Sequence, residues 1–293
     1  MVKPFFTIII VSYNAGDDLL ESVGSILKQN YKSFRIIIKD GGSTDGSIER
    51  TEKLLGIKAN EYKETDKYVI IKGEDNGIYD AMNIATTFLK KDKSETGEGS
   101  FVYFLGCGDI LSNEAVLTRV HDGIIRRRRR LEKDETCIFY GDIKEALTGQ
   151  LVSSNPKIDD FACYRNVPSH QACFYDERLI WEKTFDTNYV VRADYDHFLK
   201  CFYQNDAVTV YTRLTVAQYK GGGFSETQEN RLVSEKERKE IIAKYLPKAQ
   251  IAKYDLIRMA TLAPIRTRLA EDPKTAGVYN AIKKKIYQMK NGK

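Results

Sequence analysis

Apolar runs rich in β-branched residues alternate with helix-forming stretches through the first half of the 293-residue chain. A spacing of about 30 residues between successive runs is typical of strand–helix–strand units. Such units predict the α/β class, with a Rossmann-like, mostly parallel sheet, right-handed connections and helices on its faces. The expected strands are residues 5–11, 34–39, 68–71, 101–105 and 137–140, and the expected helices are residues 17–28, a helix capped at 43–45 that runs toward 55, 79–89 and 113–125.

Polar and glycine-rich segments follow four of these strands, at or just beyond the point where each strand ends. In parallel sheets of this class, ligands bind outside the carboxyl ends of the strands. Because those ends meet at one edge, we expect the four segments to form one ligand site. They are Ser12-Tyr13-Asn14, Asp40-Gly41-Gly42-Ser43, Glu74-Asp75-Asn76-Gly77 and Gly106-Cys107-Gly108-Asp109.

Asp40 closes the second strand and opens the segment DGGSTDGS, residues 40–47. One interpretation is a turn with a helix cap, which accounts for Ser43, Thr44 and the glycines without any ligand. The other is nucleobase recognition, because a carboxylate at the rim can accept a hydrogen bond from N3–H of uracil. Both interpretations stay open from these residues alone.

The segment 106–109 also has two interpretations. Its glycines match the cofactor loop of S-adenosylmethionine-dependent methyltransferases, although that loop normally follows the first strand and this one follows the fourth. Alternatively, Asp109 binds a divalent cation that neutralises a diphosphate, since hard cations prefer oxygen ligands, and Gly108 lets the backbone approach a nucleotide. The chain lacks both GxGxxG after its first strand and GxxxxGK[ST], which argues against dinucleotide binding and P-loop phosphoryl transfer.

Beyond about residue 145 the alternation weakens, and the expected elements are a helix at 195–203, a strand at 208–211 and a charged helix from 226 toward 245. Three consecutive glycines, Gly221–Gly223, predict a hinge or a close approach to a ligand. We therefore expect one domain over 1–225, with a nucleotide-binding part at about 1–145 and a second part at about 146–225. A helical carboxyl-terminal region at 226–293 would follow.

The net charge and the cysteine content indicate which partners and which cellular compartment to expect for the protein. The net charge of +5 is concentrated in residues 250–293, which hold ten Lys and Arg against three Asp and Glu. This tail predicts either helices that pack on protein, including a second copy in a homo-oligomer, or a helix on an anionic membrane surface. Nucleic acid is not expected, because no recognised nucleic-acid-binding motif accompanies the charge. Five scattered cysteines without CxxC spacing, and no apolar run of transmembrane length, predict a cytoplasmic protein, peripheral at most on the inner face of the cytoplasmic membrane.

Two charged segments need their own interpretation. Arg126–Arg130 is a run of arginines, for which a solvated loop and a contact with anionic headgroups or a phosphorylated acceptor both stay open. Near the carboxyl terminus, apolar residues share one face of an expected helix beside Lys283–Lys285. They are Val278, Tyr279, Ile282, Ile286 and Met289.

Seven segments that occur in order over residues 5–225 carry a specific resemblance. They are TIIIVSYN (7–14), DGGSTDGS (40–47), EDNGIYDAMN (74–83), FLGCGDIL (104–111), VPSHQACF (167–174), ADYDHFLK (193–200) and GGGFS (221–225). With them the chain resembles glycosyltransferase family 2, the group with the GT-A fold. Within that family it is similar to bacterial enzymes that build surface polysaccharide or lipopolysaccharide. The resemblance implies that residues 1–225 form the catalytic domain, with the acceptor and catalytic part at about 146–225.

The resemblance implies roles for individual residues. Asp194 aligns with the family's catalytic carboxylate, and Asp196 is a second candidate because Ala193 replaces the usual acidic neighbour. Asp109 would be the metal-binding member of the DxD element, although neither of the two preceding positions carries a carboxylate. The implied donor-binding residues are Tyr13, Asn14, Asp40, Asp75, Asn76, Asp80 and Gly108, and contacts with the diphosphate or the acceptor would come from His170, Gln171 and Gly222, with a purely structural His170 left open.

The implied activity is that of an inverting hexosyl- or N-acetylhexosaminyl-transferase. It would move a sugar from a nucleotide donor, expected to be a UDP-sugar, onto a glycan or a lipid-linked saccharide. In inversion one carboxylate deprotonates the acceptor hydroxyl, and bound Mn²⁺ or Mg²⁺ stabilises the leaving diphosphate. The alternatives are an S-adenosylmethionine-dependent methyltransferase and a non-catalytic sugar-nucleotide-binding subunit.

Overall fold

The structure, a computed structural model, describes residues 5–63, 66–89, 99–130, 132, 135–180, 184–222, 227–261, 275, 277, 278 and 282. It divides into two compact units, Met1–Ile241 and Ile242–Lys293, and the first contains the sheet and every expected site residue. The boundary between the units falls inside helix α7, Gln228–Tyr245. The functional division that the sequence places at residue 225 stays a prediction.

The described residues contain nine strands, eight α-helices and two short 3-10 helices. The strands are β1 (Phe6–Ser12), β2 (Phe34–Asp40), β3 (Tyr68–Lys72), β4 (Phe101–Gly106), β5 (Ile110–Leu111), β6 (Cys137–Glu145), β7 (Leu151–Val152), β8 (Cys173–Asp176) and β9 (Val208–Tyr219). The helices are α1 (Asp18–Leu27), α2 (Ser47–Leu55), α3 (Ile78–Thr86), α4 (Val116–Arg128), α5 (Asp160–Arg165), η1 (His170–Ala172), η2 (Glu177–Leu179), α6 (Ala193–Gln204), α7 (Gln228–Tyr245) and α8 (Lys248–Ala260).

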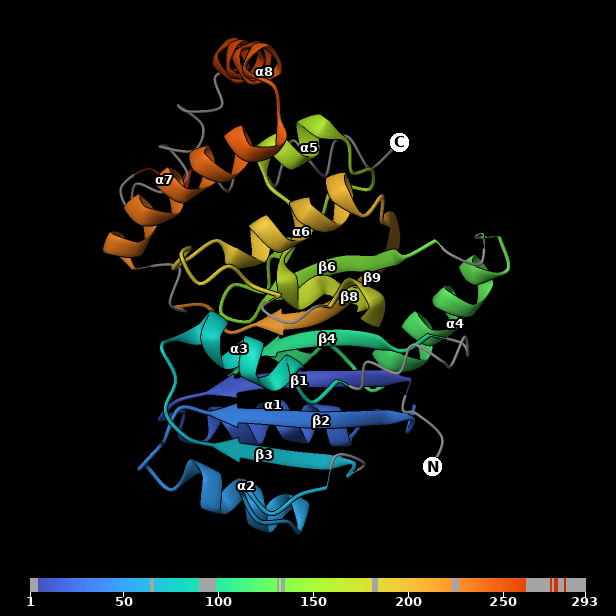
Figure 1. The fold of residues 1–293 in the computed structure, drawn as a ribbon, viewed down its shortest axis with the longest axis vertical. Coiled ribbons are helices and arrows are strands. Elements are labelled where there is room, and N and C mark those ends of the chain that lie inside the picture. Colours follow the sequence, from blue (N-terminus) through green and yellow to red (C-terminus); the bar gives the residue numbers. More distant parts are fainter. Residues whose placement is uncertain are drawn as a thin grey trace. The chain divides into compact units, whose positions relative to one another are not determined.

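The strands form one sheet in the order β3-β2-β1-β4-β8-β6-β9-β5, with β7 paired to β6 (Figure 1). β3, β2, β1 and β4 run parallel, and β9 is parallel to β6. β8 lies antiparallel between β4 and β6, so β6 and β9 keep the direction of the first four strands. The predicted α/β class with a mostly parallel sheet is confirmed.

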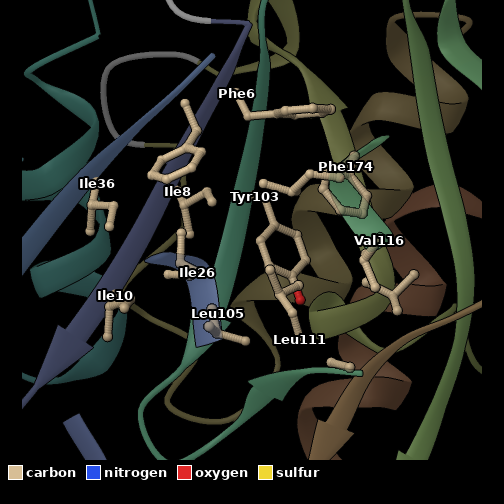
Figure 2. Packing of buried hydrophobic residues seen from close by; sticks show 14 of the residues in the cluster. Phe6, Ile8, Ile10, Ile26, Ile36, Tyr103, Leu105, Leu111, Val116 and Phe174 are labelled. Carbon is tan, nitrogen blue, oxygen red and sulfur yellow. The ribbon is translucent and has the colours of Figure 1, made fainter. Parts of the chain in front are cut away.

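Both faces of the central strands are buried, as their continuous apolar sequences predict. One face of the strands carries a cluster of buried apolar residues. Ile9, Ile37 and Phe104 are buried on the opposite face, and α3 packs against β1 and β2. Burial of one such side chain contributes about 1.5–3 kcal/mol, so the sheet is a rigid support for the loops at its ends. In the cluster, residues of α1 and α4 pack against alternate residues of the strands. Figure 2 shows part of the cluster: Phe6, Ile8, Ile10, Ile26, Ile36, Tyr103, Leu105, Leu111, Val116 and Phe174.

Strand register brings the segments after the strands together. Ser12 pairs with Asp40, and Asp40 pairs with Lys72, so β1, β2 and β3 end in one row. β4 ends beside them, because Gly106 pairs with Val11. The four polar segments therefore share one rim, as the sequence predicts.

Local differences from the sequence-based expectations have physical causes. α2 begins at Ser47 and not at 43–45, because Gly46 adopts φ 76° and Ser43 is used in the preceding turn. The arginine run is no loop at its start, since Arg126–Arg128 form the last turn of α4, where cations complement the helix dipole. Arg128 also pairs with the buried carboxylate of Asp176 at 3.6 Å.

Elements β5, β7, β8 and α5 were not predicted, because they are short or lie where the strand–helix alternation weakens. Of the expected carboxyl-terminal helical face, only Val278 and Ile282 lie among the described residues, and both are exposed. Tyr279, Ile286, Met289 and Lys283–Lys285 lie outside the described residues. Over the part of the chain that the structure describes, no helix is long and apolar enough to cross a membrane.

Candidate active site

Tyr13 and Asp75 meet across Gly41 at the rim of the sheet. A Cβ built on Gly41 would lie 3.1 Å from Tyr13 Cδ2 and 3.2 Å from Asp75 Oδ2. Tyr13 is 69% exposed, so its ring presents an aromatic face to solvent directly after β1. An exposed ring beside a carboxylate offers stacking and a hydrogen-bond acceptor, which together suit a nucleobase.

Asp40 and Asn14 lock the turn that follows β2. The Asp40 carboxylate is buried and accepts hydrogen bonds from the N–H groups of Gly42 at 2.9 Å and Ser43 at 2.8 Å and from the Ser43 hydroxyl. Asn14, at φ 46°, accepts from Thr44 N–H at 3.0 Å, and its own N–H donates to Ser43 Oγ at 2.7 Å. The structure therefore shows that Asp40 stabilises the turn. A contact of Asp40 with a nucleobase stays a prediction.

Lys39 is a site residue that the sequence reading did not identify. Its ammonium is buried at the end of β2 and donates to the carbonyls of Asp40 and Gly73, both at 2.8 Å, and to Asp75 Oδ2 at 2.6 Å. Buried charges persist where they are paired and fully hydrogen-bonded. Lys39 thus ties β2 to the segment after β3 and fixes the orientation of Asp75. A lysine directly after the apolar run Ile36–Ile38 was the available signal.

The acidic residues after β3 organise the start of α3. Asp80 Oδ2 accepts from the backbone N–H of Asn76 at 2.9 Å and from its side-chain amide at 3.2 Å. The other oxygen of Asp75, Oδ1, accepts from Gly77 N–H at 3.1 Å. The structure thus brings the expected donor-binding residues Asp75, Asn76 and Asp80 into one hydrogen-bonded turn.

Asp194 sits in the first turn of α6 among three hydrogen-bond donors. Its Oδ1 accepts from the Tyr79 hydroxyl at 3.0 Å and from Tyr195 N–H at 2.8 Å, and its Oδ2 lies 3.3 Å from His170 Nδ1. Burial acts to raise the pKa of Asp194, but the His170 ring and the Tyr79 hydroxyl outweigh it and hold that pKa below its usual value. Asp194 is therefore a carboxylate at neutral pH.

His170 presents its second ring nitrogen without a partner. An ionised Asp194 can only accept, so Nδ1 of His170 carries the proton between them. Nε2 is buried and has no hydrogen-bond partner among the described residues. A buried polar atom left in this state is costly unless a ligand completes it.

Asp109 and Gln171 form the neighbouring pair. Gln171 Nε2 donates to Asp109 Oδ2 at 3.0 Å, and the backbone N–H of Lys220 donates to Oδ1 at 2.9 Å. Asp109 is 3% exposed, and burial raises its pKa above the usual value despite these hydrogen bonds. Gly106 is required here, since a Cβ at that position would lie 2.5 Å from Asp109 Oδ2.

One 3-10 turn therefore connects the two expected chemical centres. His170 contacts Asp194, and the next residue, Gln171, contacts Asp109. Gly222, at φ 70°, lies two residues after Lys220 and so belongs to the same corner of the rim. Asp196 is buried, whereas Asp194 remains partly exposed, so accessibility favours Asp194 of the two candidates.

The residues present do not form a complete metal site. Over the described ranges, no group of three or more His, Cys, Asp or Glu side chains could hold a metal ion. Cys107 adds no ligand as it stands, because burial raises its pKa to about 12 and keeps it a thiol. Asp109, with His170 as the nearby nitrogen donor, fits a metal that the donor diphosphate also coordinates and does not fit one that the protein holds alone.

Known proteins of similar sequence are glycosyltransferases. The glycosyl transferase family 2 model matches residues 7–115. A PGL/p-HBAD biosynthesis glycosyltransferase of Mycobacterium bovis is 31% identical over 229 residues, which cover 78% of this chain and 81% of that protein. The amylovoran biosynthesis glycosyltransferase AmsB of Erwinia amylovora is 24% identical over 203 residues, which cover 65% of this chain and 62% of that protein.

Solved structures share the fold. S. aureus TarS 1-349, in complex with UDP, matches with a TM-score of 0.60 at 17% identity, covering 85% of this chain and 69% of that one. The mannosyltransferase PcManGT from Pyrobaculum calidifontis, in complex with GDP-Man and Mn²⁺, matches with a TM-score of 0.53 at 13% identity, covering 95% and 84%. The predicted GT-A fold is confirmed by these likenesses. Because the identity of 31% extends over most of both proteins, the chain belongs to glycosyltransferase family 2.

Proposed function

We propose that this glycosyltransferase inverts the anomeric centre of its donor sugar and uses Asp194 as the general base. The observation that carries the proposal is the connection of Asp194 to Asp109 through the consecutive residues His170 and Gln171. It supports a carboxylate base close to the group that we expect at the leaving diphosphate. Inversion needs that pairing, because the acceptor attacks opposite the departing group.

The protein groups divide the chemistry between them. Asp194, ionised at neutral pH, accepts the proton of the acceptor hydroxyl as that hydroxyl attacks. The Tyr79 hydroxyl and the His170 ring orient the carboxylate. We propose that His170 Nε2, which is buried and has no partner among the described residues, contacts the diphosphate or the acceptor once ligand binding exposes it.

A UDP-sugar is the donor that we propose. The exposed Tyr13 ring beside Asp75 supports a base site at the rim, with Asp40 and Asn14 holding the adjacent turn. Neighbours of the same fold have been solved with UDP, with UDP-GlcNAc and with GDP-Man, which supports a nucleotide-sugar donor and a hexosyl or N-acetylhexosaminyl group. Gly108 and Gly222 would allow backbone approach to the diphosphate.

Mn²⁺ or Mg²⁺ is the proposed cofactor, held jointly by Asp109 and the diphosphate. When bound, such an ion stabilises the negative charge that develops on the leaving group. The fold neighbour solved with GDP-Man also contains Mn²⁺. Asp109 keeps its carboxylate aimed by Gln171 and the Lys220 N–H.

The acceptor that we propose is a saccharide or lipid-linked saccharide of bacterial surface polysaccharide or glycolipid biosynthesis. The named relatives act in PGL/p-HBAD and amylovoran biosynthesis. A cytoplasmic enzyme bound peripherally to the membrane suits such acceptors. α8 carries exposed Leu256 and Met259 beside Lys253 and Arg258, a composition suited to an anionic surface.

The membrane proposal has a direct test. Sedimentation with vesicles of phosphatidylglycerol and phosphatidylcholine at low salt should pull down the full chain, and a truncation after residue 247 should stay in solution. Equal behaviour of both proteins would contradict membrane binding. Light scattering of the same samples would reveal a homo-oligomer that uses this region instead.

Titration of UDP with and without Mn²⁺, followed by a donor panel assayed by nucleoside diphosphate release, tests the function. Metal-dependent binding with turnover supports the proposal, and binding without turnover on any donor would indicate a non-catalytic subunit. The anomeric configuration of the product, read by NMR, decides inversion. The methyltransferase alternative is not favoured, because Gly106 accommodates the Asp109 carboxylate and the family is one of glycosyltransferases.

A further inference from the structure

An ion pair occupies the position beside the loop 106–109 where further carboxylates of a DxD element would stand. Gly108 adopts φ 93°, and a Cβ built there would lie 3.2 Å from Asp18 Oδ2 and 3.3 Å from Lys220 Cδ. The ammonium of Lys220 pairs with Asp18 Oδ1. A lysine and an aspartate from opposite ends of the chain thus cover this glycine.

Strand pairing determines the place of Lys220. Ile110 of β5 pairs with Gln218 of β9, which brings the residues after β9 to the residue before β5. The Lys220 N–H donates to Asp109 Oδ1 at 2.9 Å as a result. The backbone of Lys220 is therefore fixed on the expected metal ligand, whatever its side chain does.

The Lys220 side chain, by contrast, is only lightly held. It is 52% exposed, and Asp18 is 35% exposed, so solvent screens their attraction. Asp18 and Glu21 make the surroundings of the ammonium acidic. A diphosphate that arrives at this acidic corner needs a cation from the protein in addition to any metal.

We propose that Lys220 is a donor-binding residue whose ammonium leaves Asp18 and binds a phosphate oxygen when the diphosphate occupies the loop 106–109. This inference rests on the proposed nucleotide-sugar donor. Charge-assisted hydrogen bonds from lysine to phosphate are stronger than an exposed ion pair with a carboxylate, so the exchange favours the bound state. Lys220 thereby supplies positive charge to the diphosphate that the metal at the shortened DxD element would otherwise supply alone.

Calorimetric titration of UDP and of uridine, each in the presence of EDTA and in the presence of Mn²⁺, tests the inference. Lys220→Met should weaken UDP binding about 10-fold and leave uridine binding within 2-fold of wild type, because only the diphosphate loses a contact. Lys220→Arg should retain most of the UDP affinity. Lys58→Met is the matched control, since Lys58 is also an exposed lysine paired with a carboxylate, Glu52 at 3.8 Å, and should bind UDP as wild type does.

A second variant tests the exchange of partners. Asp18→Asn removes the competing carboxylate and should tighten UDP binding by about 2-fold or more without a change for uridine. Unchanged or weaker UDP binding would overturn the exchange. UDP affinity of Lys220→Met within 2-fold of wild type, in a protein of unchanged melting temperature, would overturn the role of Lys220 alone. Wild-type protein that binds neither UDP nor GDP, with or without Mn²⁺, would instead overturn the proposed donor class and this inference with it.

Discussion

The Tyr79 hydroxyl donates to Asp194 Oδ1 at 3.0 Å and lies 2.7 Å from the Val191 carbonyl. The two side chains are 115 positions apart in the sequence and come from α3 and α6. Burial and the Asp194 charge raise the pKa of Tyr79 well above its usual value, so Tyr79 stays a neutral donor. The helix that begins beside the donor segment therefore also orients the proposed base.

Substitution Tyr79→Phe should lower kcat about 10-fold and change the donor KM by less than 2-fold. The ring is kept, and only the hydroxyl is lost, with its contacts to the Asp194 carboxylate and the Val191 carbonyl. Asp194→Asn should lower kcat by ~100-fold or more with donor binding intact, because the base itself is removed. Steady-state rates with UDP binding measured in parallel check both. Near-normal transfer by Asp194→Asn would remove Asp194 from the base role.

The pH profile reports the His170–Asp194 contact. Because the pKa of Asp194 is held below its usual value, the acid limb of the wild-type kcat/KM profile should lie at lower pH than the titration of an ordinary aspartate. His170→Ala removes one of the groups that lower this pKa, so the acid limb should move to higher pH. Because the pKa of Asp194 is lowered in the folded state, its ionised carboxylate stabilises the fold above the unfolded-state pKa. This contribution is lost as the pH falls through the folded-state pKa. An acid limb that does not move in His170→Ala would show that the contact does not tune the base.

The strand–helix alternation was sufficient to predict the sheet and the rim, because apolar runs and post-strand polar segments are local in sequence. Asp109 and Asp194 were identifiable because each lies in a recognisable segment. The partners of these residues were not identifiable in the same way. Tyr79 and Lys220 reach them only through the packing of α3 against the sheet and the pairing of β5 with β9.

Asp40 illustrates the opposite difficulty. Its position at the end of a buried strand suggested a ligand contact, yet its oxygens accept three hydrogen bonds from the turn that follows. Lys39, one residue earlier, was passed over as part of the strand but connects three groups at the rim. A sequence shows which residues reach the rim, whereas register and turn geometry decide which of their atoms remain available.

Glu237 of α7 holds the segment that leads into α6. Its carboxylate accepts from the N–H groups of Val190 at 2.6 Å, Val191 at 3.0 Å and Arg192 at 2.9 Å, and it is buried. Glu237→Gln turns one acceptor into a donor that faces these N–H groups, so it should cost about 1–3 kcal/mol of unfolding free energy. It should also lower kcat more than it raises the donor KM, because Asp194 follows directly.

Glu240→Gln is the matched control for Glu237→Gln, since Glu240 lies three residues further along α7 and is half-exposed in a pair with Lys236. Surface pairs of this kind contribute about 0–1 kcal/mol, so both stability and kcat should stay near wild type. Urea unfolding and steady-state kinetics on the two variants separate a local effect on Asp194 from a general effect of charge loss on α7. Equal loss in both would contradict the positioning role.

Asp109 should lower the stability of the free protein at neutral pH and should support metal-dependent donor binding. In the metal-free, donor-free protein, burial raises its pKa, so the stability it allows is full below the unfolded-state pKa and is lost as pH rises through the folded-state value. Asp109→Asn removes this loss, and a flipped Gln171 amide can accept from the new side-chain amide while its NH₂ group faces Ser169 Oγ. Relative to wild type, the melting temperature of Asp109→Asn should therefore rise as the pH is raised from 4 to 7. The same variant should lose the enhancement of UDP binding by Mn²⁺, because its remaining oxygen is neutral. A variant that is less stable at pH 7 than at pH 4, relative to wild type, would show that the charged form of Asp109 is favoured in the fold even without an ion.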